Sequence, residues 1–166
     1  AGKFAETVAV YLATGNREKF VGIVTAAATL HDLGKLCPEN QAILYSGGRD
    51  RLPVRHEDAG AAQLLQARNI AAALLVYAHH GGLPSLGREL EEKRGLCFRV
   101  PEAAARTDRE LAGWLAEHRR WVSLAIPPLS APADGTGLWR RMALSCLVDA
   151  DHTDTARHCR GLVPIV

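Results

Sequence analysis

A histidine and an aspartate stand side by side at the end of an apolar run, as His31 and Asp32 after residues 20–30. Imidazole and ionised carboxylate together suit divalent transition metals, whereas an all-oxygen site favours magnesium or calcium. Consecutive helical positions lie ~100° apart, so the two side chains can reach two neighbouring ions, and Lys35 follows one turn later. A buried His-Asp pair can instead be a structural hydrogen bond or a helix cap. The pattern predicts a two-metal centre, with the structural pair as its alternative.

A second doublet, His79-His80, ends the apolar segment 70–80 and precedes two glycines. A single histidine there would more often be a core or capping residue, but two neighbouring imidazoles at the end of a buried helix are difficult to explain as solvated surface. His56 begins another helical segment and is weak evidence by itself. The doublet repeats the arrangement seen at the His-Asp pair and indicates further metal ligands.

Carboxylates near the end of the sequence offer a cation-binding group. Asp149 and Asp151 lie in the segment 144–154, whose first part is apolar. At least one of the two carboxylates is expected to enter the interior, where it needs a cation. They lie ~200° apart around a helix, so one of them faces inward and the other faces away.

The elements that must position these residues are expected to be helices, because alanine and leucine dominate, aromatic residues are only 5%, and alternating β-branched patterns are rare. The expected helices span 2–14, 17–34, 38–45, 56–68, 70–80, 102–124 and 136–157. Glycine, proline and charge mark the expected loops 46–55, 81–101 and 127–137. The predicted fold class is all-α, an irregular helical bundle. Three tryptophans are expected in its core: Trp114, Trp121 and Trp139.

The whole chain favours a single domain over residues 1–166, because 166 residues that are 48% apolar can bury a sizeable core. Four cysteines without a close pair are expected to be reduced thiols, which indicates a cytoplasmic protein. The apolar runs reach roughly half the ~20 residues of a membrane span, so no membrane partner is expected. A net charge of +2 leaves any nucleic-acid binding to a local patch.

The order His-Asp, His, His-His, Asp resembles the HD superfamily of metal-dependent phosphohydrolases. More narrowly, it is similar to the HD nuclease domain of the CRISPR-associated type I helicase-nuclease, over roughly residues 20–157. The motifs that carry the resemblance are 31-HDLGK-35 with Gln41 behind it, 79-HHGGLP-84 and 145-SCLVDADHTDT-155. Together they are much more specific than any one of them, so the expected bundle is of the HD type, with the metal site between helices.

The resemblance implies a role for each candidate residue. Asp32 would bridge two metal ions, and Lys35 would contact the scissile phosphate. The first ion would be bound by His31 and by Asp151, for which Asp149 is the alternate. Three histidines would bind the second ion: His56, His79 and His80. Catalysis would depend on Asp32 and Lys35, with up to two manganese, iron, cobalt or nickel ions, magnesium being less suited to these ligands.

One ligand of the family has no counterpart here, because its first helix normally adds a histidine to the first metal and no histidine precedes His31. We expect either that this ligand lies upstream of Ala1 in a longer natural chain, or that the first metal binds more weakly. The second site keeps its three histidines and the shared carboxylate.

The expected function is hydrolysis of single-stranded DNA in CRISPR interference, an antiviral defence. The expected partners are single-stranded DNA, a helicase domain fused or supplied in trans, and the CRISPR surveillance complex. Four arginines in expected loops can contact phosphates or be ordinary solvated charges: Arg49, Arg51, Arg55 and Arg88. One alternative is a phosphohydrolase of a small nucleotide or cyclic dinucleotide, against which 81-GGLP-84 argues. Another is a catalytically weakened helical interaction module.

Overall fold

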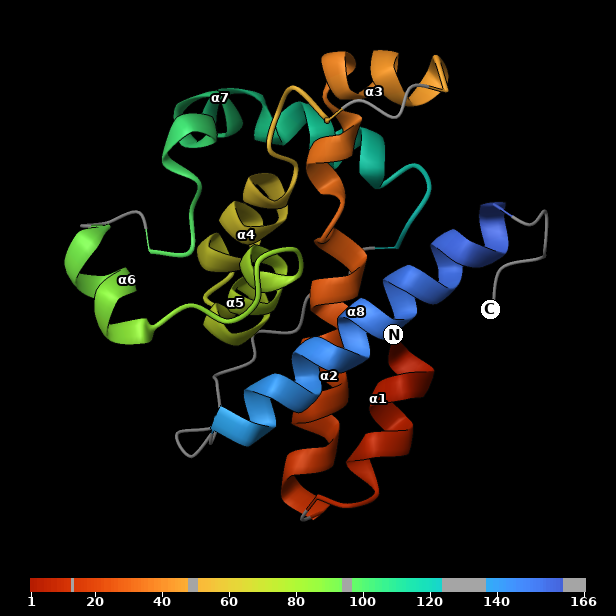
Figure 1. The fold of residues 1–166 in the computed structure, drawn as a ribbon, viewed down its shortest axis with the longest axis vertical. Helices are drawn as coiled ribbons and strands as arrows, with labels where there is room; N and C mark the ends of the chain where they lie inside the picture. The colour runs from red at the N-terminus through yellow and green to blue at the C-terminus, as the bar shows by residue number, and fades with distance from the viewer. Residues whose placement is uncertain (13, 48–50, 94–96, 124–136, 160–166) are drawn as a thin grey trace.

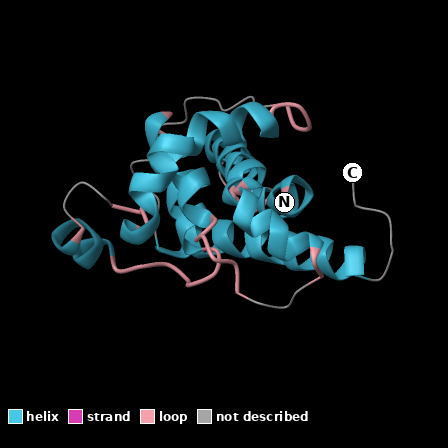
Figure 2. Ribbon diagram, turned by 90° about the horizontal axis from the view of Figure 1, so that it is seen from above, coloured by secondary structure: helices cyan, strands magenta, loops and turns pink. Residues whose placement is uncertain are grey.

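The computed structural model describes residues 1–12, 14–47, 51–93, 97–123 and 137–159. Every regular element in these ranges is a helix, so the all-α prediction is confirmed (Figures 1 and 2). The elements are α1 (Gly2–Ala9), α2 (Thr14–Leu30), the 3₁₀ helix η1 (Leu33–Leu36), α3 (Pro38–Tyr45), α4 (Glu57–Gln66), α5 (Ile70–Ala78), α6 (Leu86–Glu92), α7 (Pro101–His118) and α8 (Gly137–Cys159).

Helix α2 is the centre of the bundle. It contacts α1, α4, α5 and α8. Fully buried apolar side chains recur along it with helical spacing: Phe20, Ile23, Val24, Ala27 and Leu30. The apolar run therefore fixes the end of α2 rigidly in the core, directly before His31.

Helix α8 crosses α2 and reaches α1 and α5 (Figure 1). Its buried stripe consists of Trp139, Ala143, Cys146 and Leu147. Asp151 lies four residues after Leu147, so it continues the stripe that faces the bundle. Asp149 is exposed on another side of the helix.

Helices α4 and α5 pack closely on each other, and α7 packs on α4 and η1. Asp58 in the first turn of α4 is completely buried and forms a bidentate ion pair with Arg99, with both N–O distances 2.9 Å. The same carboxylate accepts a hydrogen bond from the Val100 backbone N–H at 2.7 Å. This ion pair ties the start of α4 to the segment that leads into α7.

Two predicted helix ends are wrong, because side chains replace the backbone as hydrogen-bond partners. The predicted helix 17–34 ends at Leu30, where His31 and His118 contact the carbonyls of Ala28 and Thr29. The predicted helix 2–14 ends at Ala9, after which Arg17 donates to the carbonyls of the following turn. His31 and Asp32 consequently lie after a helix, where we expected them on one.

Two further expectations also fail. The segment 86–92, expected to be irregular, is helix α6, because buried Glu89 pairs with Lys93 at 3.0 Å and accepts the Phe98 N–H at 2.8 Å. Trp121 is 78% exposed, since α7 ends at His118 and the spacing that placed it on the face of Trp114 no longer applies.

Trp114 and Trp139 are buried as expected.

In the described part of the chain, no single helix is long and apolar enough to cross a membrane. One pair of segments, 15–36 and 38–45, meets that test only when its two parts, bent by 86°, are counted together.

Candidate metal centre

His31 and His79 occupy equivalent positions, each just after the last residue of a core helix. The Nδ1 atom of His31 lies 2.8 Å from the Ala28 carbonyl, and that of His79 lies 2.5 Å from the Val76 carbonyl. A carbonyl accepts only, so Nδ1 carries the proton in both rings and Nε2 keeps its lone pair. Both Nε2 atoms are buried and have no hydrogen-bond partner among the described residues. Each helix end thus presents a free nitrogen to the site.

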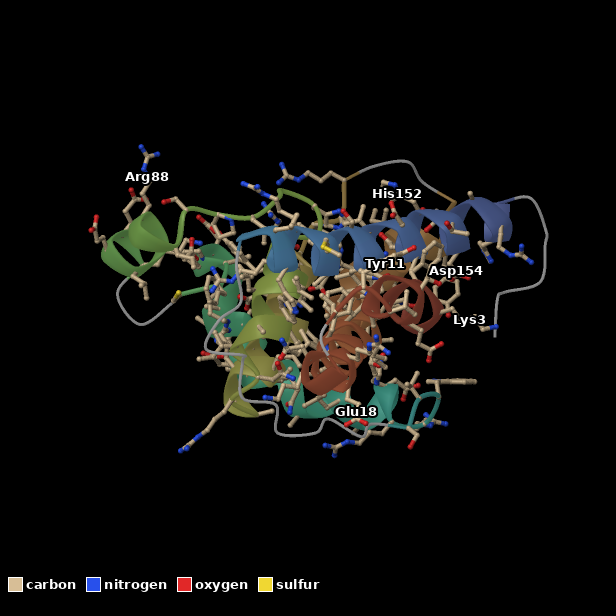
Figure 3. All side chains as sticks on the ribbon, turned by 90° about the horizontal axis from the view of Figure 1, so that it is seen from below. Lys3, Tyr11, Glu18, Arg88, His152 and Asp154 are labelled. Atoms are coloured by element: carbon tan, nitrogen blue, oxygen red, sulfur yellow. The ribbon has the colours of Figure 1, made fainter. Side chains whose placement is uncertain are left out.

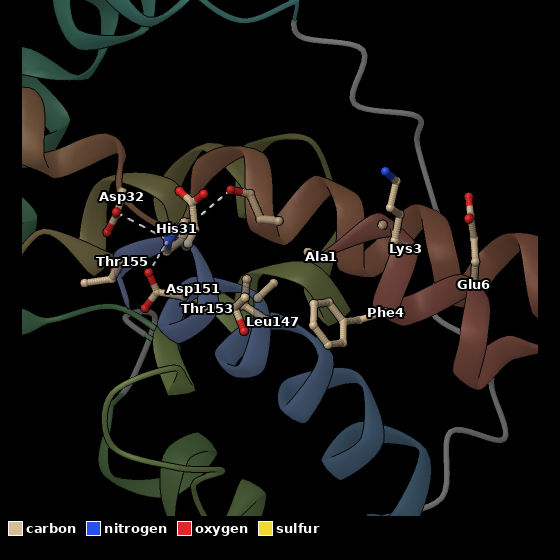
Figure 4. A pocket seen from close by; sticks show the side chains of 14 residues that line it. Ala1, Lys3, Phe4, Glu6, His31, Asp32, Leu147, Asp151, Thr153 and Thr155 are labelled. Carbon is tan, nitrogen blue, oxygen red and sulfur yellow. Dashed lines mark hydrogen bonds and ion pairs between the residues drawn. The ribbon is translucent and has the colours of Figure 1, made fainter. Parts of the chain in front are cut away.

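The first ligand set consists of His31, Asp32 and Asp151. The Nε2 atom of His31 lies 3.3 Å from Asp32 Oδ2 and 3.6 Å from Asp151 Oδ1 (Figure 4). One ligand atom from each of the three residues lies within 4.8 Å of the others. Of the two candidate late aspartates, it is Asp151 that reaches the site, while Asp149 points elsewhere.

The second ligand set consists of His56, His79 and His80, whose ligand atoms also lie within 4.8 Å of one another. The Nε2 atoms of His56 and His80 are 2.9 Å apart, with their rings nearly perpendicular. Two nitrogens at ~2.1 Å from one ion, at right angles, are ~3 Å apart. The spacing therefore fits two ligands of a shared ion.

Asp32 lies between the two sets. Its Oδ1 atom is 3.5 Å from His56 Nε2, while its Oδ2 atom faces His31 and also accepts a hydrogen bond from Lys35 Nζ at 2.7 Å. Side chains three residues apart eclipse each other on a 3₁₀ helix, which is why η1 brings Lys35 over Asp32. One carboxylate thus lies against both ligand sets and accepts a hydrogen bond from the Lys35 ammonium group.

The protonation states of His56, His79 and Asp151 match those that metals require, whereas a metal at the first set would have to displace a proton favoured on His31. Burial lowers the pKa of His56 and of His79 from 6.5 to about 4, so both imidazoles are neutral at pH 7. Burial also acts to lower the pKa of His31, but the contact with Asp151 and the Asp32 charge outweigh it and raise the pKa. The contact with His31 lowers the pKa of the Asp151 carboxyl to about 2. Neutral imidazoles and ionised carboxylates are the metal-binding forms.

The residues fit divalent transition metal ions on three observations. The buried Nε2 atoms of His31 and His79 and the buried Oδ1 of Asp32 have no hydrogen-bond partner in the described structure. A buried polar atom without a partner is costly, and a cation would satisfy all three. The His/Asp groups can therefore hold metal ions, as the sequence predicted in general terms.

Two glycines let the ligand-bearing segments approach one another. A Cβ on Gly60 of α4 would lie 2.0 Å from the Leu30 carbonyl oxygen at the end of α2. A Cβ on Gly34 of η1 would lie 2.4 Å from the His56 carbonyl oxygen, which accepts the Gly34 N–H. Any side chain at either position would push the His-Asp turn away from the remaining ligands.

Asn40 is a positioning residue that the sequence analysis missed. It is completely buried, and its amide bonds the carbonyls of Gly34 and Val54 at 3.0 and 2.9 Å, while Val54 N–H donates to its oxygen. It thereby joins η1 to the segment that leads to His56. No sequence pattern marks Asn40.

The role of Gly60 could have been predicted from the sequence. A glycine inside the alanine-rich helix 57–66 costs ~1 kcal/mol relative to alanine, so its presence there indicates a close contact.

Of the four arginines considered as phosphate contacts, the three that the structure describes do not form one patch. Arg51 and Arg55 line a small hollow of about 280 Å³ beside His56 and His80, where Arg55 pairs with Glu57. Arg88 projects from α6 into solvent at the end of the molecule opposite His152 (Figure 3). Arg49 lies outside the described residues.

A cavity of about 660 Å³ opens on the first ligand set (Figure 4). It extends from His31, Asp32 and Asp151 along α8 to the start of α1, where Phe4 and Leu147 form part of its wall. The candidate metal centre is accessible from this side.

Comparison with known proteins finds no counterpart: no protein-family model, no curated protein and no solved structure matches this chain.

Proposed function

We propose that the chain is a metal-dependent hydrolase of the HD type that cleaves phosphodiester bonds in single-stranded DNA. The observation that carries the proposal is the position of Asp32, with Oδ1 3.5 Å from His56 and Oδ2 3.3 Å from His31. A carboxylate that offers one oxygen to each of two ligand sets is suited to bridging two ions. A structural His-Asp pair would account for the first set but not for His56 facing the other oxygen of the same carboxylate, beside His79 and His80.

Two divalent ions held by these ligands would supply an activated water and polarise the phosphodiester. The chain's own residues orient that chemistry. The carbonyl hydrogen bonds of His31 and His79 hold both rings with Nε2 toward the site. Lys35, a third exposed, holds Asp32 in place and presents an ammonium group to an approaching phosphate.

The choice of substrate rests on the resemblance to the CRISPR-associated nuclease domain. On that basis the chain acts in the cytoplasm on single-stranded DNA delivered by a helicase and a CRISPR surveillance complex, with manganese, iron, cobalt or nickel as its ions. The mixed imidazole and carboxylate ligands favour these metals over magnesium.

A second candidate function has one observation in its favour. The cavity beside the first ligand set, about 660 Å³, is in the size range of small-molecule pockets, and Phe4 in its wall can contact a base. A small nucleotide is therefore the alternative substrate, hydrolysed by the same residues.

Cleavage assays on the full natural chain test the proposal. With manganese, cobalt or nickel, labelled single-stranded DNA should be degraded, and Asp32→Ala and Asp151→Ala should each lower the rate at least ~100-fold. Asp149→Ala removes an exposed carboxylate from the same helix and should leave the rate within about twofold of wild type.

Three results would contradict the proposal. Equal cleavage by wild type and Asp32→Ala would assign the activity to a contaminant. Hydrolysis of nucleotides without cleavage of DNA would favour the second candidate. Tight metal binding without either activity would favour a helical interaction module that uses its metals structurally.

A further inference from the structure

A second hollow, of about 570 Å³, lies between the first half of α8 and the connection from α5 to α6, and the proposed active site does not use it. Four apolar residues from α5, that connection and the first residue of α6 line it: Leu74, Leu83, Pro84 and Leu86. Arg140 and Arg141 line it from α8. We call it the α8 groove; it combines an apolar floor with two guanidinium groups.

Both arginines are available to bind an anion. In the part of the chain that the structure describes, neither has an ion-pair or hydrogen-bond partner, whereas Arg55, Arg99 and Arg106 each contact a carboxylate. Arg140 is half-buried and Arg141 is exposed. A guanidinium beside an apolar surface suits a ligand that carries a phosphate next to an apolar, stackable group.

The α8 groove lies on chain segments that also carry the two ligand sets. Arg140, Leu144 and Asp151 lie on one side of α8, because eleven residues make about three turns, and Arg140 is ~16 Å along the helix from Asp151 of the first set. On the opposite wall, Leu83 follows His80 of the second set by only three residues. A chain-like ligand that spans this distance could occupy the groove and the metal centre together.

We propose that the α8 groove binds the stretch of single-stranded nucleic acid next to the scissile bond. Arg140 and Arg141 contact backbone phosphates, and an unpaired base or sugar rests on the apolar floor at Leu83 and Pro84. This proposal rests on the proposed function, which supplies the phosphodiester substrate. An acidic peptide would also satisfy the arginines, but it gives no reason for their place on the same side of α8 as Asp151.

Binding can be measured without cleavage. Anisotropy of a labelled oligothymidylate is followed on the Asp32→Ala variant of the full chain in a chelator, as a function of salt. Adding Arg140→Ala and Arg141→Ala should weaken binding about tenfold and reduce the slope of log K against log salt by ~1.4, since each lost phosphate contact removes ~0.7 for a single strand. Leu83→Ala removes part of the apolar floor on which a base would rest. It should therefore lower the affinity for the oligonucleotide until it is close to the affinity for an abasic strand of equal length.

The matched control is Arg109→Ala with Arg119→Ala, an exposed arginine on α7 and the exposed arginine directly after it; α7 lies across the bundle from α8 (Figure 3). This control should leave both the affinity and the salt slope equal to those of the Asp32→Ala parent within experimental error.

Two results would contradict the proposal for the α8 groove. One is an equal loss of affinity in the two double variants. The other is competition by polyglutamate that is as effective as competition by unlabelled oligonucleotide. If the wild-type chain does not cleave DNA but the Arg140/Arg141 variant still loses binding, the proposed catalysis fails while the binding role of the groove is supported. If Arg140→Ala with Arg141→Ala leaves both cleavage and binding unchanged, the proposal for the groove is wrong while the proposed catalysis stands.

Discussion

Asp32 can contact both ligand sets because it lies in a turn. Its backbone, with φ −101° and ψ 8°, follows the last residue of α2 and begins η1. On a continuous α-helix its carboxylate would point ~100° away from His31. In the turn, the two side chains converge to 3.3 Å, and the 3₁₀ geometry brings Lys35 onto the same carboxylate. The chemistry of the candidate site thus depends on where α2 ends.

The neutral histidines of the second set predict a pH dependence of stability for the metal-free protein. Burial lowers the pKa of His79 from 6.5 to about 4. Between pH 6.5 and pH 4, His79 therefore binds a proton in the unfolded chain but stays neutral in the folded chain. Stability should be full above pH 6.5 and fall as the pH drops toward 4, by at most about 3 kcal/mol from this residue. Urea midpoints in a chelator measure the effect.

His79→Gln should flatten that pH profile, whereas His152→Gln, at an exposed histidine of α8, should change it less. The raised pKa of His31 acts in the opposite sense, because its contribution is present below pH 6.5 and is lost as the pH rises through its folded value. A wild-type midpoint that does not fall between pH 6.5 and 4 would contradict the buried, neutral state of His79.

At the scale of the elements, close backbone approaches position the ligands. The carbonyls at the end of α2 are all in close contact: Ala28 with the His31 ring of the turn itself, Thr29 with His118, and Leu30 with Gly60. Two distant elements, α7 and α4, therefore hold the residues directly before the His-Asp turn. This arrangement explains why α4 has a glycine at its contact with α2.

Gly60→Ala tests this contact. The new Cβ would lie 2.0 Å from the Leu30 oxygen, so one of the two backbones must move. We expect a loss of ~1–3 kcal/mol or more in the free energy of unfolding, together with weaker metal binding, because His31 follows Leu30. Chemical denaturation and calorimetric metal titration measure the two effects.

Gly113→Ala in α7 is the matched control, since its Cβ would meet no atom within 4 Å. It should stabilise the protein by up to ~1 kcal/mol through helix propensity alone. If Gly60→Ala behaved in the same way, the proposed contact between α2 and α4 would not constrain the site.

For the whole molecule, a buried ion pair joins parts of the chain that are distant in sequence. Asp58, in the first turn of α4 next to His56, pairs with Arg99 across 41 positions, and Arg99 also contacts exposed Asp108 on α7. The interaction links the histidine of the second ligand set to the packing of α7. Contact with Asp58 also raises the pKa of Arg99, which keeps its charge.

Asp58→Ala should cost ~3–5 kcal/mol, because it leaves the Arg99 guanidinium mostly buried and without its main partner. Asp108→Ala removes the second carboxylate of the same arginine, but this one is 56% exposed, so the cost should stay below ~1 kcal/mol. Thermal and urea unfolding of both variants check the difference. Similar costs for the two would show that burial does not distinguish the two interactions.

The sequence by itself determined the fold class and the identities of the candidate ligands. Apolar residues at helical spacing predict α2, α5 and α8, since periodicity is a local property of the chain. Neighbouring residues such as His31-Asp32 and His79-His80 are local features too. The same reasoning failed at helix ends and at Trp121, where side chains from elsewhere decide whether a helix continues.

Only the tertiary structure decided how those ligands meet. It brought Asp151 to His31 and left Asp149 exposed, gathered the histidines into the two sets that the resemblance had implied, and placed the two oxygens of Asp32 toward different sets. It also revealed buried Asn40 and the glycine contacts that bring the ligand-bearing segments together. These outcomes depend on distances of a few ångströms between segments remote in sequence, which the packing of whole helices sets and no local pattern encodes.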